Sequence, residues 1–421
     1  MTDRSAKPVT SQNSATGTGV SRRQVLGGMG GGLIAGVGGE LIASSSAKAA
    51  TPDLRTHRDG GQTQPKDQRK FGYAIVGLGN YALHQILPAF AECRYARLTA
   101  LVSGDPVKAR RIGAEYGIGP GHIYSYENFD SIARDPEVDA VYILLPTALH
   151  SAMTVRAFKA GKHVLCETPM ATSVGDCQLM LAASKRARKY LMMGYRCHFD
   201  PLTLKAVAML NGGAVGARQV VTTDNSDINV PLSEVAHSWR FDRSLSGGGS
   251  LINLGLYGVN GTRYLLDEDP VQVQACILPN KDPLFSSVED TVAWTLLYKS
   301  GAVAHGSSSY TIKDASTFRV LGDKGGLLMD PATSYWANRV SLISGDATQS
   351  WGTPQFTLPA LNQFSAELDY LAECVARQQP PVRASGQEGL QDMRLITAMY
   401  ESAHTGQPVN TSQWADWRKS L

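Results

Sequence analysis

Apolar and polar positions form regular blocks after residue 70, and these blocks predict two kinds of element in turn. Residues 71–76 are a nearly continuous apolar run, which predicts a buried strand, and a helical pattern follows through Ala91. The same succession then repeats, with strands expected at 97–102, 138–145, 162–166 and 191–194 and helices at 152–160 and 174–189. Strands that alternate with helices of this length predict an α/β domain with a parallel, doubly wound sheet over residues 71–195.

The pattern changes at residue 196. A helix expected at 201–210 leads to a strand at 217–223, and a helix at 251–266 precedes strands at 271–277, 291–298, 302–310, 317–321 and 326–329. Strands without intervening helices predict an α+β domain over residues 196–421, with a large, mostly antiparallel open sheet. Helices at 364–377 and 389–405 should pack back on the first domain. An open sheet of this kind often buries one face against another subunit, so we expect a homo-oligomer.

The first 70 residues show neither the strand-like nor the helix-like spacing of apolar positions. Ser21-Arg22-Arg23-Gln24-Val25-Leu26 is a twin-arginine signature, followed by a glycine-rich apolar run and the cleavage pattern Ala47-Lys48-Ala49. Residues 1–49 therefore read as a signal peptide for the twin-arginine export machinery, which predicts a periplasmic protein without a stable membrane anchor. A membrane helix is the alternative, which the many glycines and Glu40 disfavour. Residues 50–70 are polar and contain two prolines, as in a flexible arm.

Composition narrows the possible partners. The net charge is only +3 over 421 residues, with 18% charged residues. Binding to nucleic acid or to a membrane surface needs a concentrated basic face, so neither is expected. The six cysteines form no CxxC pair and no Cys/His cluster, so we expect free thiols and no metal site.

A glycine-rich turn joins the first strand to the first helix. Its sequence, Gly77-Leu78-Gly79-Asn80-Tyr81-Ala82, has the G-x-G-x-x-A form of a dinucleotide-binding turn. In that form Gly77 allows the tight turn, Gly79 lets the backbone approach the pyrophosphate, and Ala82 lets helix and strand pack closely. Asn80 and Tyr81 lie in the same loop, at the helix start whose free N–H groups face the phosphates. The turn therefore predicts a Rossmann domain that binds a nicotinamide dinucleotide.

The end of the second strand indicates which dinucleotide. An NAD-preferring protein usually carries an acidic residue there for the ribose hydroxyls, whereas this chain has Ser103 followed by Gly104. A serine hydroxyl can bond a 2′-phosphate and Lys108 can supply positive charge, so we expect NADP. Arg110 and Arg111 are better explained as a solvated helix face. Asp105 either caps the following helix or contacts the ribose.

Four residues at later strand ends are assigned to the cofactor, because ligands of such sheets bind at the carboxyl ends of the strands. They are Pro146, His150, Glu167 and Arg196. His150 has an equal alternative role in starting a helix. Arg196, with His198 beside it, could instead make structural hydrogen bonds.

The chain as a whole resembles the glucose–fructose oxidoreductase branch of the Gfo/Idh/MocA oxidoreductases. The resemblance is carried by Gly77-Leu78-Gly79, Leu101-Val102-Ser103-Gly104, Ala160-Gly161-Lys162-His163-Val164, Gly194-Tyr195-Arg196-Cys197-His198, Thr223-Asp224-Asn225-Ser226-Asp227, Gly247-Gly248-Gly249-Ser250-Leu251 and Tyr257-Gly258. It implies tightly held NADP, oxidation of an aldose to its lactone, and reduction of a ketose to an alditol in the same site. It also implies a tetramer in which the N-terminal arm embraces a neighbouring subunit.

The resemblance implies an acid/base tyrosine, which is Tyr257 here, and a Glu-Lys-Pro motif. That motif reads Glu167-Thr168-Pro169, and the aspartate expected four residues before the tyrosine is Asn253. Losing one positioned charge commonly slows catalysis about 100-fold or more. Turnover is therefore slow, or another cation substitutes, or the substrate differs. Arg196 and Lys162 are the nearest candidate cations in the sequence.

The sugar is expected to contact Tyr257, Arg196, Trp239 and Asp224. Trp239, with His237 nearby, could stack on the apolar face of a sugar, although core packing is the more common role of a tryptophan. Asp224 belongs to a polar cluster after a strand, where turn or capping duty is as good an explanation as sugar binding. A competing hypothesis is an NADP-bound sugar-binding homologue with weak catalysis, motivated by Thr168 and Asn253.

Overall fold

A computed structural model describes residues 69–227, 238–344, 347–352 and 362–414. The predicted signal peptide, nearly all of the predicted arm and His237 lie outside these ranges. Within them, no helix has the length and apolar character needed to cross a membrane. The same ranges contain no group of three or more His, Cys, Asp or Glu side chains that could hold a metal ion.

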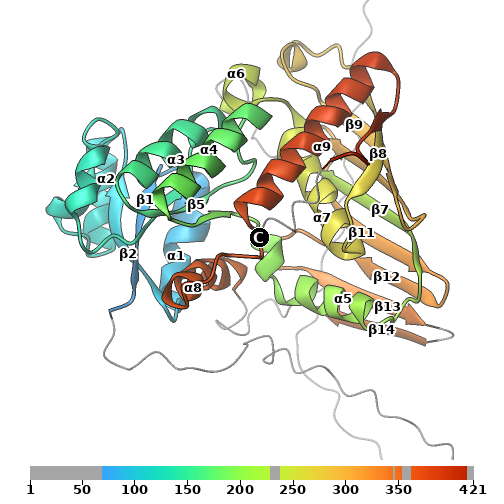
Figure 1. Ribbon diagram of the computed structural model, residues 1–421, viewed down its shortest axis with the longest axis horizontal. Helices are drawn as coiled ribbons and strands as arrows, with labels where there is room; N and C mark the ends of the chain where they lie inside the picture. The colour runs from blue at the N-terminus through green and yellow to red at the C-terminus, as the bar shows by residue number, and fades with distance from the viewer. Residues whose placement is uncertain (1–68, 228–237, 345–346, 353–361, 415–421) are drawn as a thin grey trace, which may run out of the picture. The chain divides into compact units, whose positions relative to one another are not determined.

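The first domain is built on the predicted parallel sheet (Figure 1). Its six strands run in the spatial order β3-β2-β1-β4-β5-β6, and every neighbouring pair is parallel. They are β1 (Phe71–Val76), β2 (Ala96–Val102), β3 (Ile123–Tyr124), β4 (Ala140–Ile143), β5 (His163–Cys166) and β6 (Leu191–Met193). The helices between them are α2 (Pro106–Glu115), α3 (His150–Lys159) and α4 (Val174–Ala187). The central strand β1 is almost completely buried, which explains its nearly continuous apolar sequence.

The helix after β1 is not one regular α-helix. It consists of a π-helical turn (Ala82–Ile86), α1 (Leu87–Ala89) and a 3-10 turn (Phe90–Glu92). Pro88 has no amide hydrogen and cannot continue the α-helical hydrogen bonds from the preceding turn, so the chain changes its winding around it. The predicted helix through Ala91 is therefore present in position but mixed in type.

The second domain contains the predicted large sheet, which has nine strands in the order β14-β13-β12-β11-β7-β10-β9-β8-β15. All neighbouring pairs are antiparallel except β7 and β10, which are parallel. The strands are β7 (Arg218–Ser226), β8 (Pro270–Leu278), β9 (Thr291–Tyr298), β10 (Val303–Ser309), β11 (Ala315–Gly322), β12 (Gly325–Met329), β13 (Arg339–Ser344), β14 (Ala347–Gly352) and β15 (Val409–Asn410). The sequence pattern did not predict β13, β14, β15 or the short β3. The fold class predicted from the sequence is confirmed.

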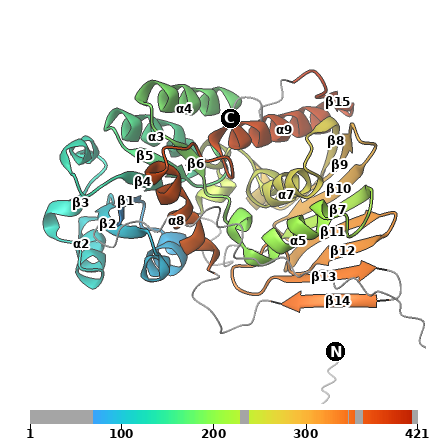
Figure 2. The same ribbon diagram turned by 60° about the horizontal axis from the view of Figure 1, so that its bottom comes forward.

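Helices cover one face of the nine-stranded sheet (Figure 2). They are α5 (Pro201–Asn211), α7 (Leu256–Leu266) and α9 (Gly386–Thr405), which contact β13, β7 and β8 respectively. Alternate residues of β9 are buried, as expected for a strand with one covered face. The helix-covered face therefore holds the core of this domain.

The C-terminal helices contact the first domain. The Tyr73 hydroxyl of β1 donates a hydrogen bond of 2.9 Å to the carbonyl of Leu368 in α8 (Gln363–Ala376). The next residue, Asp369, accepts hydrogen bonds of 2.7–2.8 Å from three consecutive backbone amides at the start of β2. Ahead of α9, the Ala384 carbonyl accepts a hydrogen bond of 2.7 Å from the amide of Met193 in β6. The end of the chain thus contacts two interior strands of the first sheet, β1 and β2, and its edge strand β6.

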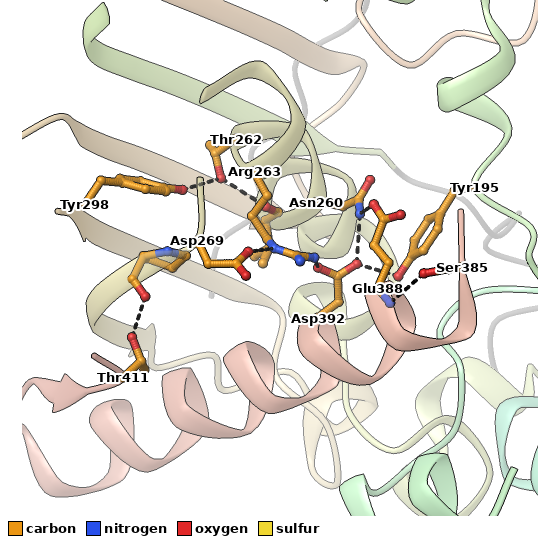
Figure 3. A network of polar contacts seen from close by, with 12 residues as sticks. Tyr195, Asn260, Thr262, Arg263, Asp269, Tyr298, Ser385, Glu388, Asp392 and Thr411 are labelled. Carbon is orange, nitrogen blue, oxygen red and sulfur yellow. Dashed lines mark hydrogen bonds and ion pairs between the residues drawn. The ribbon is translucent and has the colours of Figure 1, made fainter. Parts of the chain in front are cut away.

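A buried ion network connects α7 and α9 (Figure 3). Arg263, whose side chain is 2% exposed, donates to Asp269 at 2.6 Å and to Asp392 in α9. The other oxygen of Asp392 accepts hydrogen bonds from the Tyr195 hydroxyl and from the Asn260 amide. Burial raises the pKa of Asp392 to about 6, while Arg263 favours its ionised form. The network therefore ties the end of the first sheet to both helices.

We predict that Arg263→Met lowers the free energy of unfolding by about 3–5 kcal/mol, because Asp392 would remain buried without its cation. Denaturant unfolding at neutral pH measures the change. The control is Arg377→Met, since Arg377 forms only an exposed pair with Glu373 one turn away on α8 and should cost less than about 0.5 kcal/mol. A loss below about 1 kcal/mol for Arg263→Met would show that the network contributes little.

Candidate active site

The dinucleotide turn has the geometry that its sequence predicts. Gly77 has a φ of +94°, and a Cβ at this position would lie 2.3 Å from the Leu144 carbonyl oxygen. By contrast, no described atom lies within 4 Å of a Cβ at Gly79. The helical turn that begins after Tyr81 has no side-chain cap among the described residues. Open space above Gly79 and an uncapped helix start fit the pyrophosphate of a dinucleotide.

The ribose end of the predicted cofactor site lies after β2. Ser103 is buried, and its hydroxyl accepts a hydrogen bond of 3.1 Å from the Asp105 amide; Gly104 between them is exposed. Asp105 caps α2 by accepting hydrogen bonds from two amides of its first turn, one of them that of Lys108, so capping is the observed role. Arg111 is exposed and pairs with a carboxylate one turn later, as a solvated face would. No acidic side chain replaces Ser103 at the strand end itself.

His150 lies where the helix-start alternative placed it. It follows the turn after Pro146 and begins α3, and its ring is 1% exposed. Its Nδ1 lies 3.0 Å from the carbonyl oxygen of Pro169, and its Nε2 lies 2.8 Å from that of Leu145. Burial lowers the pKa of His150, and the hydrogen bonds to the two carbonyls oppose that shift. In its neutral form the ring has one N–H and donates to only one of the two carbonyls.

Arg196 supplies a cation beside the predicted acid/base tyrosine. Its side chain is 4% exposed, and its guanidinium carbon lies 5.0 Å from the ring centre of Tyr257 and 4.5 Å from that of Tyr335. Arg196 donates to the Thr333 carbonyl at 2.6 Å and to the Gln363 side chain at 3.0 Å. Burial raises the pKa of Tyr257, and the positive charge of Arg196 opposes that rise.

Thr168 of the Glu-Thr-Pro motif and the predicted acid/base tyrosine Tyr257 line the same cavity. It is lined by Thr168, Tyr195, Cys197, Leu256, Tyr257, Asn260 and Tyr264. Two buried polar atoms at or beside it have no hydrogen-bond partner among the described residues: the Tyr264 hydroxyl and the Arg196 Nε. Buried polar atoms normally have partners, so their presence here fits a polar ligand.

Glu167 lies beside this cavity in a group of acidic and phenolic side chains. Its Oε1 accepts a hydrogen bond from the Tyr142 hydroxyl, and its Oε2 accepts one of 3.2 Å from the Thr168 amide. The Tyr142 hydroxyl also lies 3.4 Å from Oε2 of Glu367 in α8. Burial raises the pKa of Glu167 to about 7 and that of Glu367 well above its usual range. Glu367 was missed because α8 carries no recognisable motif and lies far along the chain from β4 and β5.

Two of the expected site residues, Lys162 and Asp224, lie away from the cavity. Lys162 is at the start of β5, where its ammonium donates to the Asp135 and Val138 carbonyls at 2.8 Å; this is the end of the strand away from Glu167, so Lys162 is not the substitute cation. Asp224 points to the exposed face of β7 and accepts a hydrogen bond from a β10 serine. The alternation of a strand puts it opposite the face that α7 covers.

Trp239 and Asn253 are outside the residues that line the cavity. Trp239 lies in a 3-10 turn (Trp239–Phe241), where its ring is 4.8 Å from the Arg240 guanidinium carbon. Asn253 lies in the π-helical turn (Leu251–Gly255) one turn before Tyr257. Its role in catalysis therefore stays a prediction, while stacking of Trp239 on a sugar in this cavity has no support from the geometry.

The family of the chain follows from comparison with known proteins. Residues 71–195 match an oxidoreductase family with an NAD-binding Rossmann fold (GFO_IDH_MocA), and residues 207–411 match its C-terminal α/β domain. The chain belongs to the Gfo/Idh/MocA oxidoreductase family. It is thus an NAD(P)-dependent oxidoreductase of a family that acts on the CH–OH groups of sugars.

Individual relatives agree with this assignment. The chain is 28% identical over 348 residues to a D-xylose 1-dehydrogenase [NADP(+)] of Haloarcula marismortui, covering 83% of this chain and 95% of that protein. It is similar to the crystal structure of aldose–aldose oxidoreductase from Caulobacter crescentus complexed with glycerol, with a TM-score of 0.77 and 44% identity over 81% of this chain and 100% of that one. A levoglucosan dehydrogenase in complex with NADH and levoglucosan shares the fold, with a TM-score of 0.70 and 21% identity over 82% of this chain and 100% of that one.

We predict opposite effects for alanine at the two turn glycines. Gly79→Ala should leave stability within about 0.5 kcal/mol of the native value, since its Cβ meets open space, but should weaken binding of the nicotinamide dinucleotide at least about tenfold. Gly77→Ala should instead lower the unfolding midpoint, because its Cβ would collide with Leu144. Thermal unfolding and cofactor titration separate the two effects. Unchanged cofactor affinity in Gly79→Ala would mean that the dinucleotide does not approach this backbone.

Proposed function

We propose that this protein is a periplasmic sugar oxidoreductase that retains NADP, oxidises an aldose to its lactone, and then reduces a ketose to an alditol in the same pocket. The observation that carries the proposal is the cavity that Thr168 and Tyr257 share at the carboxyl end of the parallel sheet, beside Arg196. The 44% identical aldose–aldose oxidoreductase supports an aldose as the first substrate and adds aldoses to the candidate second substrates.

We assign different residues to cofactor binding, to orientation of the sugar and to stabilisation of charge. Gly77 and Gly79 shape the pyrophosphate site, and Ser103 with Lys108 favours the 2′-phosphate of NADP. The bound nicotinamide supplies hydride acceptance and donation. Tyr257 lines the cavity, and its hydroxyl is the group assigned to bond the C1 hydroxyl of a sugar and orient it. The Arg196 guanidinium stabilises negative charge that develops on the Tyr257 oxygen or on the sugar oxygen.

A cofactor that stays bound would carry the hydride between the two half-reactions, and the first product would leave before the second sugar enters.

Retention of the cofactor agrees with the proposed location. The twin-arginine signature implies export of a folded protein, which can carry a cofactor bound in the cytoplasm. The six cysteines are all free, and five of them are buried, as expected for a chain that folds in a reducing compartment. Ready loss of the cofactor on dialysis would contradict this part of the proposal.

A tetramer with exchanged N-terminal arms is part of the same proposal. The sheet face opposite α7 exposes Asp224, His305 and Arg319 and also carries partly buried aliphatic side chains such as Leu297. A broad face of mixed character can pack against a second subunit, and residues 50–70 are long enough to reach a neighbour. Sedimentation of the mature protein measures the oligomeric state, and a monomer would contradict it.

We predict that the purified protein contains NADP(H), and that an aldose such as glucose raises absorbance at the wavelength of the reduced nicotinamide. Adding fructose or a second aldose should then reverse the rise. The reason is that hydride transfer from C1 reduces the bound cofactor, which only a second sugar can reoxidise. No change with any aldose in a broad panel would count against an oxidoreductase of this type.

The alternative is an NADP-bound sugar-binding protein with weak catalysis, which the neutral Thr168 motivates. On this alternative, Thr168→Lys should speed single-turnover reduction by aldose about 100-fold, because it adds a cation to the cavity that Tyr257 also lines, whereas with Arg196 as the working cation the rate should not rise. Stopped-flow absorbance measures the rate. Thr168→Met controls for side-chain length without charge. An unchanged or lower rate in Thr168→Lys would mean that the native site works by another arrangement, with Arg196 as its cation.

A further inference from the structure

The contacts of Tyr142 fix the number of protons on two neighbouring carboxyl groups. One hydroxyl lies between Oε1 of Glu167 and Oε2 of Glu367, within hydrogen-bonding distance of both. A hydroxyl carries one proton and can donate only one bond. If it donates to Glu167, the contact with Glu367 is favourable only when Glu367 carries a proton and donates in turn. Two ionised carboxylates would leave one pair of oxygens facing each other without a proton.

The surroundings of Glu167 and Glu367 also favour one proton shared by the two carboxyl groups. Glu367 is completely buried, and its Oε1 has no hydrogen-bond partner within the described part of the chain. An ionised carboxylate in that position would be costly, whereas a protonated one is tolerated. Glu167 is better solvated by the protein, because Thr168 donates to it and Tyr81 also bonds it. The negative charge therefore belongs on Glu167 and the proton on Glu367.

The other titratable or charged groups that face the pair do not change this assignment of the negative charge to Glu167 and of the proton to Glu367. They are Arg196 from the segment after β6, and the tyrosine and cysteine side chains Tyr73, Tyr81, Tyr257, Tyr335, Cys166 and Cys197. Burial keeps these phenols and thiols neutral at ordinary pH, while Arg196 stays charged. One cation and one shared negative charge make the cluster neutral overall.

We propose that Glu167 and Glu367 share one proton through the Tyr142 hydroxyl, and that this pair takes up a second proton when the first sugar is oxidised and returns it to the second sugar. The uptake rests on the proposed function. Oxidation of an aldose at C1 breaks a C–H and an O–H bond: the hydride, with both electrons, goes to the oxidised nicotinamide, and the proton goes to the pair. The nicotinamide loses its positive charge and the pair loses its negative charge in the same step, so the net charge of the site does not change.

The position of the pair suits this role. Thr168 lines the cavity, and its amide donates to Glu167 Oε2, so the carboxyl group lies one residue from the sugar site. A Cβ on Gly194 would come within 2.8 Å of Glu167 Oε1, so the glycine after β6 leaves space for the carboxyl group. The pKa of Glu167, raised by burial to about 7, lets it exchange a proton near neutral pH.

Infrared spectroscopy of the full-length protein as purified tests the shared proton without any sugar. At neutral pH the wild type should show the C=O band of a protonated carboxyl group, and Glu367→Gln should lack it. Glu373→Gln, on the same helix but partly exposed and paired with Arg377, is the matched control and should keep the band. Absence of any difference between wild type and Glu367→Gln would mean that Glu367 is ionised, and would overturn the proposal.

Proton release during reduction of the bound cofactor by aldose tests the uptake, with a pH-indicator dye in weak buffer near pH 7. The wild type should release less than about 0.5 proton per nicotinamide reduced, whereas Glu167→Gln should release about one, because the remaining carboxyl, Glu367, is already protonated and cannot take up another proton. Full release by the wild type would overturn the uptake while the oxidoreductase function stands. No reduction by any sugar, with the infrared band present, would remove the proposed function and the uptake and leave the shared proton established.

Discussion

A permanently charged side chain buried at the meeting point of three segments is the constraint around which the site is arranged. Arg196 follows the last strand of the parallel sheet, yet its hydrogen bonds go to the loop after β12 and to the first residue of α8, and its flat face lies against Tyr257 of α7. A buried guanidinium without partners would be strongly unfavourable, so these segments must come together for the charge to be tolerated. The same contacts place the cation beside the cavity.

The identity of that cation limits the chemistry. A lysine in the Glu-Lys-Pro position could both carry charge and exchange protons, but Thr168 does neither. Arg196 restores the charge and not the exchange, because a guanidinium does not release its proton under ordinary conditions. Proton movement must therefore use other side chains of this site. The phenol of Tyr257 and the two carboxyl groups around Tyr142 are the groups that the fold places there.

Local features could be predicted from the sequence, and long-range ones could not. The turn at Gly77 and Gly79 is specified by residues next to one another, and the β9 and β10 ranges follow from apolar spacing alone. Asp105 illustrates the limit: two roles were consistent with the sequence, and only the hydrogen bonds to the first turn of α2 select capping.

Strands β13 and β14 escaped prediction because serine, threonine and glycine interrupt their apolar pattern. Lys162 and Asp224 were misplaced because proximity in sequence does not say which end of a strand, or which face of a sheet, a residue occupies. Glu367 could not be found, since its importance depends on contacts with residues more than 150 positions away.

The contacts of α8 also bear on the order in which the protein can be made. The amides at the start of β2 are bonded by Asp369, and the hydroxyl of Tyr73 in β1 is bonded by the residue before it. These strands leave the ribosome early, whereas α8 is among the last segments to be synthesised. During translation, the packing of β1 and β2 therefore stays incomplete until α8 has been synthesised. A chain that terminates early would expose the parts of β1 and β2 that α8 covers, and quality-control proteases and chaperones could recognise this exposed surface.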